Sequence, residues 1–454
     1  MKHKKQFRLS TTHVIMISFV VVILLGSILL SLPISSANGE RVPYLDALFT
    51  ATTATCVTGL VTVTTASAWS TFGQAVILFL IQIGGLGVIT IVSGFMIMAN
   101  KRFGLKGSQL IQDAFNIEQL SGLVIFVKKV IMGTFLIEGI GAVLYMFVFI
   151  PQFGLRGIWI SVFNAISAFC NAGMDIIGDT SLCEYTTNPM VNIVTGSLIV
   201  LGGIGFIVWW DVIRVIKRFS KEKFRCFKRL TLHSKLVISS SAFLLAAGMV
   251  LVLIFEYQNP STLGTLSTFE KLQAALFQSV TTRTAGFAAI PQEHLTDASV
   301  LVCLILMFIG GSPVGTAGGV KTVTIVVLCM TAIATIRNEE EVSVFGRRLS
   351  KQVARKAIAV TGMSMMIMLT AAILLAAIMP DAALADILYE VVSATATVGL
   401  SRNLTACLPV LGKMLIIVVM YFGRVGPISL AIAFNVENQV HNIIKNPVEE
   451  VRVG

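Results

Sequence analysis

The sequence predicts an all-α polytopic membrane protein of eight transmembrane helices, arranged as four parallel repeats of helix, short re-entrant segment and helix. Hydrophobic residues make up 55% of the 454 residues and charged residues only 13%, whereas about a quarter of the residues of a soluble protein are charged. Apolar runs of about 20 residues, long enough to cross a bilayer as a helix, recur along the whole chain.

Four short stretches that contain a glycine near their end reveal an internal repeat. They are Thr52-Thr53-Ala54-Thr55-Cys56-Val57-Thr58-Gly59-Leu60, Phe169-Cys170-Asn171-Ala172-Gly173-Met174, Thr282-Arg283-Thr284-Ala285-Gly286-Phe287 and Thr395-Ala396-Thr397-Val398-Gly399-Leu400. Gly59, Gly173, Gly286 and Gly399 are separated by 114, 113 and 113 residues, close to a quarter of the chain. A fixed period of this kind indicates repeated structural units. The predicted repeats cover residues 1–108, 109–222, 223–345 and 346–454, the last with a cytosolic C-terminal tail.

The net charge of +11 is concentrated in five segments, which hold 26 of the 34 Lys and Arg residues. These segments are 1–11, 101–129, 214–235, 337–356 and 441–454. Because basic connections stay in the cytosol, each repeat is predicted to leave the cytosol and return to it, with both termini cytoplasmic. This placement points to a lipid bilayer and argues against nucleic acid as a partner. The first apolar run exceeds the length of a signal-peptide core, so we expect a membrane helix there, with cleavage as the less favoured alternative.

The apolar runs predict two long helices in each repeat. They lie near 12–33 and 72–100, 123–150 and 190–216, 234–256 and 298–336, and 354–379 and 408–435. Between them lie segments too short to cross a bilayer alone, at 44–55, 159–173, 269–287 and 384–400. These segments end in Thr, Ser, Ala and Gly, and non-helical backbone at membrane depth is tolerated only inside protein or beside a water-filled cavity. Each is therefore predicted to be a re-entrant pore helix followed by a loop.

Two further features that recur in each repeat are interpreted as packing residues. An aromatic residue stands nine or ten positions before each loop glycine, at Phe49, Phe163, Phe277 and Tyr389. The second helices contain related glycine motifs that begin at Gly84, Gly202, Gly310 and Gly423, and small residues allow helices in membranes to approach closely.

Four loops of this composition around one axis predict a cation pore. A dehydrated ion needs oxygen atoms to replace its lost water, and glycine reaches the positive φ values that aim carbonyls at an axis. The predicted fold is thus four parallel helix–pore loop–helix repeats around a central pore, with K⁺ or another monovalent cation at the filter carbonyls. The candidate ion-binding residues are Thr55, Cys56, Val57, Thr58, Gly59, Cys170, Asn171, Ala172, Gly173, Thr282, Arg283, Thr284, Ala285, Gly286, Thr395, Ala396, Thr397, Val398 and Gly399.

These motifs resemble those of the Trk/Ktr/HKT superfamily of potassium transporters. The resemblance rests on Cys56-Val57-Thr58-Gly59-Leu60, Thr282-Arg283-Thr284-Ala285-Gly286-Phe287, Thr316-Ala317-Gly318-Gly319-Val320-Lys321 and Arg424, and it extends over essentially the whole chain. With eight membrane helices, the chain is most similar to the membrane subunit of the bacterial Ktr type. The resemblance implies one filter glycine in each repeat. It favours potassium, because Gly59 stands where some plant sodium transporters have serine.

The second helix of repeat three is interrupted by a glycine-rich segment, residues 310–319. Pro313 removes a backbone donor, so a kinked packing helix is one interpretation, whereas the resemblance implies an intramembrane gating loop beneath the filter. The predicted gate residues are Gly310, Gly311, Ser312, Pro313, Gly315, Thr316, Gly318, Gly319 and Arg424.

Arg424 replaces the second glycine of the motif in repeat four. A charge near the bilayer centre is costly and by default functional, so we expect Arg424 to oppose cation passage and to hydrogen-bond carbonyls of the gating loop. The alternative is a buried ion pair with Glu138. Lys321 is expected at the cytosolic end of the broken helix.

The resemblance also implies partners. They are a second copy of the chain, in a homodimer with one pore per subunit, and a cytosolic ring of nucleotide-binding, Rossmann-type regulatory subunits on the basic inner loops, at a bacterial plasma membrane. The chain itself shows no cofactor motif. Potassium is the expected ion, and both sodium coupling and sodium activation are compatible with the sequence.

Three other functions are weighed against potassium uptake. A sodium-conducting member of the same superfamily would share the loops. A secondary transporter of a small solute is disfavoured, because midplane solute sites usually need inverted or two-half symmetry and these repeats are parallel. An enzyme is disfavoured because the helices contain no HExxH motif or paired acids, and the seven scattered cysteines and five histidines show no metal-ligand spacing.

Overall fold

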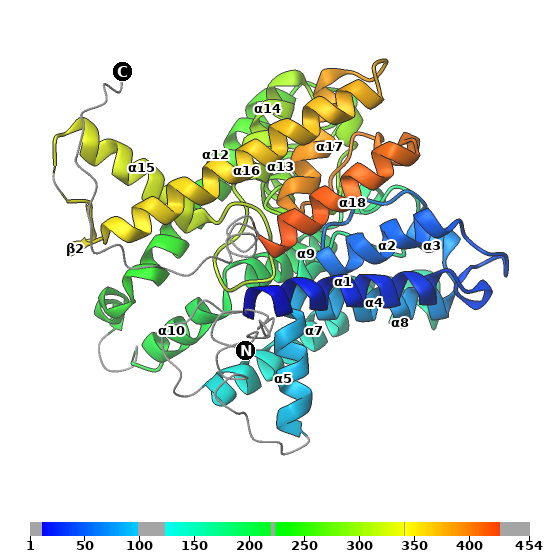
Figure 1. Ribbon diagram of the computed structural model, residues 1–454, viewed down its shortest axis with the longest axis horizontal. Coiled ribbons are helices and arrows are strands. Elements are labelled where there is room, and N and C mark those ends of the chain that lie inside the picture. The colour runs from blue at the N-terminus through cyan, green and yellow to red at the C-terminus, as the bar shows by residue number, and fades with distance from the viewer. Residues whose placement is uncertain (1–10, 99–122, 219–222, 340, 427–454) are drawn as a thin grey trace, which may run out of the picture.

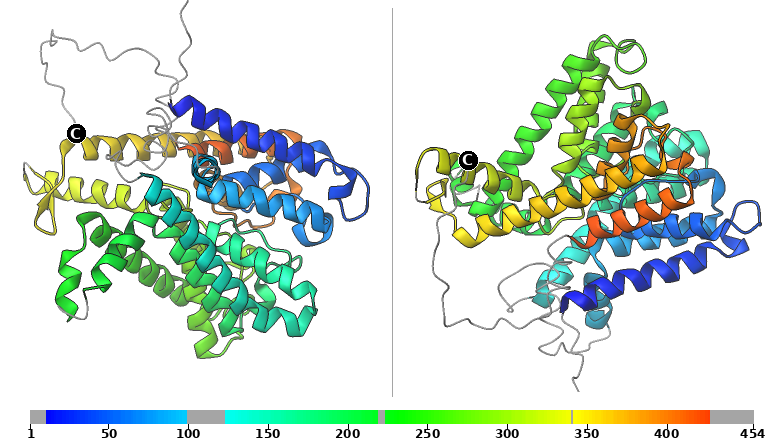
Figure 2. Two further views of the ribbon diagram at one scale, coloured as in Figure 1. Left: turned by 90° about the horizontal axis from the view of Figure 1, so that it is seen from below. Right: turned by 45° about the horizontal axis from the view of Figure 1, so that its top comes forward.

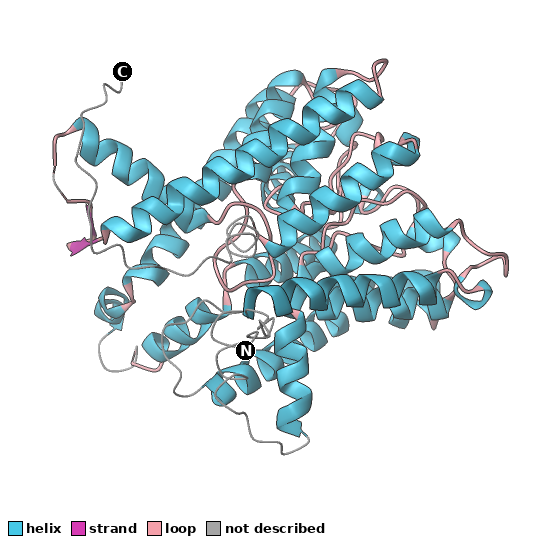
Figure 3. Cartoon of the chain, viewed as in Figure 1, coloured by secondary structure: helices cyan, strands magenta, loops and turns pink. Residues whose placement is uncertain are grey.

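The computed structural model describes residues 11–98, 123–218, 223–339 and 341–426. Helices dominate this part of the chain (Figure 3), and its strands are one short antiparallel pair, β1 (Ser343–Val344) and β2 (Arg347–Arg348). The basic N-terminus, residues 101–122 and the C-terminal tail, on which much of the topology prediction rests, lie outside the described residues.

The first two repeats occupy one half of the molecule and share one plan, in which a short helix packs between longer ones. In Figure 1, α2 lies against α1 and α4, and α8 packs against α7 and α9 in the same way. Their helices are α1 (Thr11–Leu30), α2 (Tyr44–Cys56), α3 (Thr65–Ala68), α4 (Thr71–Leu86), α5 (Val88–Met98), α7 (Leu123–Phe153), α8 (Arg156–Cys170), α9 (Pro189–Gly203) and α10 (Phe206–Ile216).

The fourth repeat follows the same plan, whereas in the third the short helix α13 (Thr268–Thr281) packs against α12 (Leu232–Glu256) and against α9 of repeat two. In both views of Figure 2, α16 runs beside α18, and α17 packs against both. The helices of these two repeats are α12 (Leu232–Glu256), α13 (Thr268–Thr281), α14 (Asp297–Phe308), α15 (Thr322–Ile336), α16 (Lys351–Ile378), α17 (Leu384–Ala396) and α18 (Val410–Val425). Short 3₁₀ turns lie at Pro33–Ser35, Cys183–Tyr185, Lys223–Arg229, Gln292–His294 and Thr405–Cys407.

Capping residues set where several of these helices begin. Ser70, Thr296 and Ser350 each accept a hydrogen bond from the backbone N–H three residues on, before α4, α14 and α16. Ser267 and Glu270 form a reciprocal capping box at the start of α13. These interactions satisfy backbone donors that a helix start otherwise leaves unpaired.

Four described helices, α1, α7, α12 and α16, are long and apolar enough to cross a membrane, and the bent pair α9 and α10 would make a fifth. Within their most apolar windows only 22% to 33% of residues are buried, so most residues of these windows are at least partly exposed. A membrane supplies the apolar surroundings that such a surface requires. The eight-span count stays a prediction.

The short helices α2, α8, α13 and α17 form the core of the molecule. The aromatic residues assigned to packing, Phe49, Phe163, Phe277 and Tyr389, are all at most 2% exposed. In repeats one, two and four, the first glycine of the second-helix motif explains how the longer helix approaches the short one so closely. A Cβ atom added to Gly84, Gly202 or Gly423 would meet the carbonyl oxygen of Thr55, Phe169 or Thr395, respectively, near the end of a short helix.

The predicted single helices near 72–100 and 190–216 are wrong, because a glycine breaks each of them. Gly87 and Gly205 have φ values of 84° and 93°, and α9 and α10 meet at a bend of 100°. In repeat four, α18 ends at Gly426, with φ of 89°; the rest of its predicted helix, to 435, lies outside the described residues. Glycine takes up positive φ without a steric penalty. The last glycine of the motif therefore interrupts the helix, whereas the first glycine lets the same helix pack closely against a short helix.

We expect Gly84→Ala to destabilise the protein by about 1–3 kcal/mol, the usual cost of overpacking, because its methyl group would overlap Thr55 O. Gly362→Ala is the matched control: Gly362 lies within α16 with no atom within 4 Å of an added Cβ, so alanine should not lower stability. Thermal midpoints in detergent measure both. Equal midpoints for the two variants would contradict the close approach of α4 to α2.

Candidate functional site

Each of the four loops has the same two unusual backbone turns. Two positions before the glycine stands a non-glycine residue in the left-handed region: Val57, Asn171, Thr284 and Thr397, with φ values of 56°, 60°, 66° and 52°. The glycines Gly59, Gly173, Gly286 and Gly399 have φ values of 98°, 64°, 86° and 101°. Non-glycine residues rarely adopt positive φ, and such strain persists only where the surroundings enforce it. Loops of different sequence thus share one conformation.

The four glycines form a closed ring. A Cβ atom added to Gly59 would lie 3.2 Å from the Cα atoms of both Gly173 and Gly399, and one added to Gly286 would lie 3.0 Å and 3.2 Å from the same two atoms. Each added Cβ would also meet the carbonyl oxygen just before the glycine of the next repeat: Ala172, Ala285, Val398 and Thr58, in order round the ring. Residues more than a hundred positions apart therefore meet at one axis, where any added Cβ would crowd the backbone of a neighbouring repeat.

Hydroxyl groups of the short helices hold three of these loops. The Gly59 N–H donates to Thr53 Oγ1 at 2.9 Å, and the Gly399 N–H donates to Ser393 Oγ at 3.0 Å. In repeat two, Met174 N–H donates to Ser167 Oγ at 3.1 Å.

The third loop differs from the other three. Val280 stands where they have a hydroxyl, and α13 ends five residues before Gly286 instead of three. Here Thr281 Oγ1 donates to the carbonyl of Phe287 at 2.7 Å. The backbone conformation at Thr284 and Gly286 is nevertheless kept.

On one side of the ring lies a cavity of about 370 Å³ that all four glycines line. Asp175, Asp179 and Glu293 also line it, and its described lining contains no Lys or Arg. Carboxylates around a concave surface raise the local concentration of cations. The cavity is therefore suited to collecting cations at the mouth of the ring.

On the other side lies the segment between α14 and α15, residues 309–321, which we call the gate loop. It contacts residues that precede the loop glycines: Thr316 Oγ1 donates to Phe169 O at 3.0 Å, and a Cβ atom added to Gly318 would meet Thr397 Oγ1. The cavity is lined by residues that follow the glycines, such as Val61 and Asn403. The gate loop and the cavity thus lie at opposite ends of the ring.

The middle of the gate loop is bonded to the broken helix of repeat two. Ser312 N–H donates to Gly203 O at 2.9 Å, and Thr316 N–H donates to Gly202 O at 3.1 Å. Phe206 N–H, just beyond the break, donates to Val314 O at 2.9 Å, and Val314 has a φ of 61°. The loop therefore uses backbone groups that the helix break leaves free.

Arg424 links the gate loop to repeat one. Its Nη1 donates to Thr316 O at 2.6 Å, while Nη2 donates to the carbonyls of Gly84 and Gly85. The predicted contact with a gate-loop carbonyl is present. The alternative pairing with Glu138 is wrong, because that carboxylate accepts from Gln82 Nε2 at 3.3 Å instead.

Two other predicted side chains donate to carbonyls of the gate loop. Lys321 immediately precedes α15 and donates to Ala317 O at 2.6 Å, within the gate loop; its predicted place at the cytosolic end of the broken helix stays a prediction. The side chain of Arg283 leaves the ring and donates to Gly310 O. Cys56 and Cys170 are buried and free, and Cys170 packs against Gly85, as expected for packing residues.

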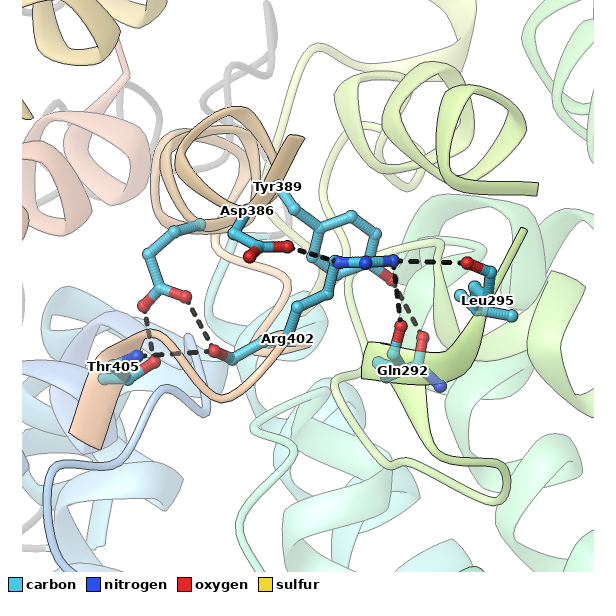
Figure 4. A network of polar contacts seen from close by, with 8 residues as sticks. Gln292, Leu295, Asp386, Tyr389, Arg402 and Thr405 are labelled. Atoms are coloured by element: carbon cyan, nitrogen blue, oxygen red, sulfur yellow. Dashed lines mark hydrogen bonds and ion pairs between the residues drawn. The ribbon is translucent and has the colours of Figure 1, made fainter. Parts of the chain in front are cut away.

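A polar network beyond the ring went unnoticed in the sequence (Figure 4). Arg402, just after the fourth loop, pairs with Asp386 at 2.6 Å and donates to Gln292 O at 3.2 Å. Tyr389 O–H donates to Gln292 Oε1 at 2.8 Å, so the third and fourth loops are tied together. The expectation that no helix holds paired acids is wrong, because α17 contains Asp386 and Glu390, and this pair was the available signal. Glu390 accepts from Ser401 and Thr405.

Comparisons with known proteins agree with this architecture. Residues 1–445 match the family described as "TrkH: Cation transport protein". The chain is 38% identical to the potassium/sodium uptake protein NtpJ of Enterococcus hirae, over 100% of this chain and 99% of that protein. It is 39% identical to the Ktr system potassium uptake protein B of Bacillus subtilis, over 99% and 98%. The crystal structure of the potassium transporter TrkH from Vibrio parahaemolyticus shares the fold, with a TM-score of 0.74 at 17% identity over 95% of this chain and 86% of that chain.

We expect Gly399→Ala to disrupt the ring, since its methyl group would need a positive φ and would press against Thr58 O and the Cα atom of Gly59. Gly39→Ala separates the two causes, because Gly39 has a φ of 72° but no neighbour within 4 Å. The alanine at 399 should therefore lower the thermal midpoint more than the alanine at 39. The ring geometry would be refuted if both variants lost the same stability.

Proposed function

Because this chain belongs to the TrkH family of cation transport proteins, we propose that it takes up potassium ions through the ring of four loops. The observation that supports this most is the ring itself, in which each glycine faces the carbonyl oxygen that precedes the next one. Carbonyl oxygens around an axis replace the water that an ion loses. We assign the ion-binding role to the backbone of the four loops, residues 55–59, 170–173, 282–286 and 395–399.

The proposed path runs from the acidic cavity through the ring to the gate loop. Asp175, Asp179 and Glu293 would gather cations outside the cell, and the ring would select among them. The gate loop then obstructs the inner end, with Arg424 placing a positive charge beside the obstruction. Opening the path requires the gate loop to give up its bonds to Gly202, Gly203 and Arg424.

The wider setting follows from the family. We propose a multi-pass protein of a bacterial plasma membrane, with eight spans, four parallel repeats with the boundaries given above, and both termini in the cytosol. We further propose a homodimer with one pore per subunit, regulated by a soluble ring of Rossmann-type nucleotide-binding subunits, as the family resemblance implies. The word "system" in the name of the Bacillus subtilis relative is compatible with a separate regulatory component. Sodium is the second candidate ion, because one relative is named a potassium/sodium uptake protein.

Potassium and sodium fluxes into liposomes that contain the purified protein test the function. The unaltered protein should favour potassium, and Gly59→Ser should shift the flux toward sodium by about tenfold, which corresponds to about 1.4 kcal/mol. The side chain would point at the oxygen of Ala172, within the ring. Gly39→Ser, far from any neighbour, is the control. Flux that depends on an organic solute and not on potassium would support the solute-transporter alternative.

Arg424→Gln should raise potassium flux several-fold, because it removes a positive charge from the path and weakens the bond to Thr316. Arg156→Gln, an exposed residue at the start of α8, removes one charge elsewhere and should leave the flux unchanged. If Arg424→Gln lowered the flux while the protein stayed folded, the residue would stabilise the open path instead of obstructing it.

A further inference from the structure

In the third loop an arginine occupies the place of a small residue. Three positions before the loop glycine, the other repeats have Cys56, Cys170 and Ala396, whereas the third has Arg283. The arginine is only 9% exposed. A side chain of this length cannot stay behind its own loop, so it extends to a neighbouring element.

That element is the gate loop. Arg283 Nη2 donates to Gly310 O at 3.3 Å and contacts Thr322 Oγ1 at 3.0 Å. Thr322 Oγ1 in turn donates to Gly310 O at 3.1 Å. Gly310 begins the gate loop and Thr322 begins the helix that follows it, so one guanidinium contacts both ends of the loop.

The backbone also pairs these two ends. Gly310 N–H donates to Val320 O at 2.9 Å, Val320 N–H donates to Phe308 O at 3.2 Å, and Thr322 N–H donates to Gly311 O at 3.0 Å. We call this paired segment, residues 308–311 and 320–322, the neck of the gate loop. The middle of the loop, residues 312–318, bonds instead to repeats two and four. The neck is therefore fixed to its own repeat, and the middle is held by others.

Few other contacts determine where the Arg283 guanidinium lies. Its Nε has no hydrogen-bond partner, and no ion pair with a carboxylate is found among the described residues. A cavity of about 30 Å³, lined in part by Gly203, Ser241 and Gly311, adjoins it. Buried charges are usually paired, and here the two contacts at the neck account for the observed position of the guanidinium.

We propose that Arg283 is a positioning residue that couples the third filter loop to the gate. This inference rests on the function proposed above. Because its backbone belongs to the filter and its side chain holds the neck, a displacement of the neck must pull on the third loop. In the other three loops a backbone N–H donates to a hydroxyl of the short helix, whereas the third loop is held through Thr281 Oγ1 and the carbonyl of Phe287. The Arg283 contact adds to this different anchoring.

The test compares potassium flux and the potassium-to-sodium flux ratio in liposomes for Arg283→Gln, Arg283→Lys, Thr322→Val and the double variant Arg283→Gln/Thr322→Val. We expect Arg283→Gln and Thr322→Val each to raise flux several-fold and to lower the ratio, since neck and filter both lose support. Arg283→Lys keeps a donor for Gly310 O and should change both quantities less. The effect of the double variant should be only slightly larger than the larger single effect, because both substitutions remove the same contact between Arg283 and the neck.

Two substitutions, one on α15 and one at the residue that follows it, serve as matched controls. Thr331→Val removes a hydroxyl that bonds only within its own helix, to Val327 O, and Arg337→Gln removes an exposed charge. Variants at Arg283 and Thr322 that match these controls, or that change flux or selectivity alone, would overturn the coupling, because a link between filter and gate must affect both. Unaltered protein that conducts no potassium would overturn the proposed function itself, and the coupling with it.

Discussion

The structure depends on one steric constraint: four backbones must approach a common axis until their Cα atoms are nearly in contact. Glycine favours this approach, because it has no Cβ and adopts positive φ without a steric penalty. The rest of the core serves to hold that arrangement. Short buried helices present hydroxyl groups to the loops, and the longer helices reach those short helices through glycines of their own, as Gly84 does at Thr55. Crowding of the backbone, not any single side chain, defines the site.

Much of this was predictable from the sequence because the repeat period marks the four loops independently of their composition. The short helices and the bond from Arg424 to a loop carbonyl follow from such local patterns, whereas the gate loop was expected from the family resemblance. The helix breaks at Gly87 and Gly205 were missed because a glycine that permits close packing and one that ends a helix look alike in sequence. The contacts of Glu138, Lys321 and Arg402 were missed because they join residues that only the tertiary fold brings together.

Buried cations beside the gate loop are stabilised in an unusual manner. Arg424, Lys321 and Arg283 each donate to backbone carbonyls of this loop, and none of them is paired with a carboxylate among the described residues. Such carbonyls are available because the helix is interrupted, so their hydrogen-bonding capacity is not used within a helix. The free carbonyls of the glycine-rich interruption thus accept hydrogen bonds from the cationic side chains. Carboxylates, which would trap a passing cation, are not needed to pair with these charges.

The third loop is anchored differently from the others, since the hydroxyl of Thr281 donates to a loop carbonyl instead of accepting from a loop N–H, and it has an arginine where they have small residues. Such a difference is possible because all four quarters of the ring are encoded separately in one chain. In a ring of four identical subunits every substitution appears four times. A change that is tolerated in one quarter can then disrupt the ring, because all four quarters carry it. Here each quarter can diverge alone, so a single gene can adjust conduction in small steps.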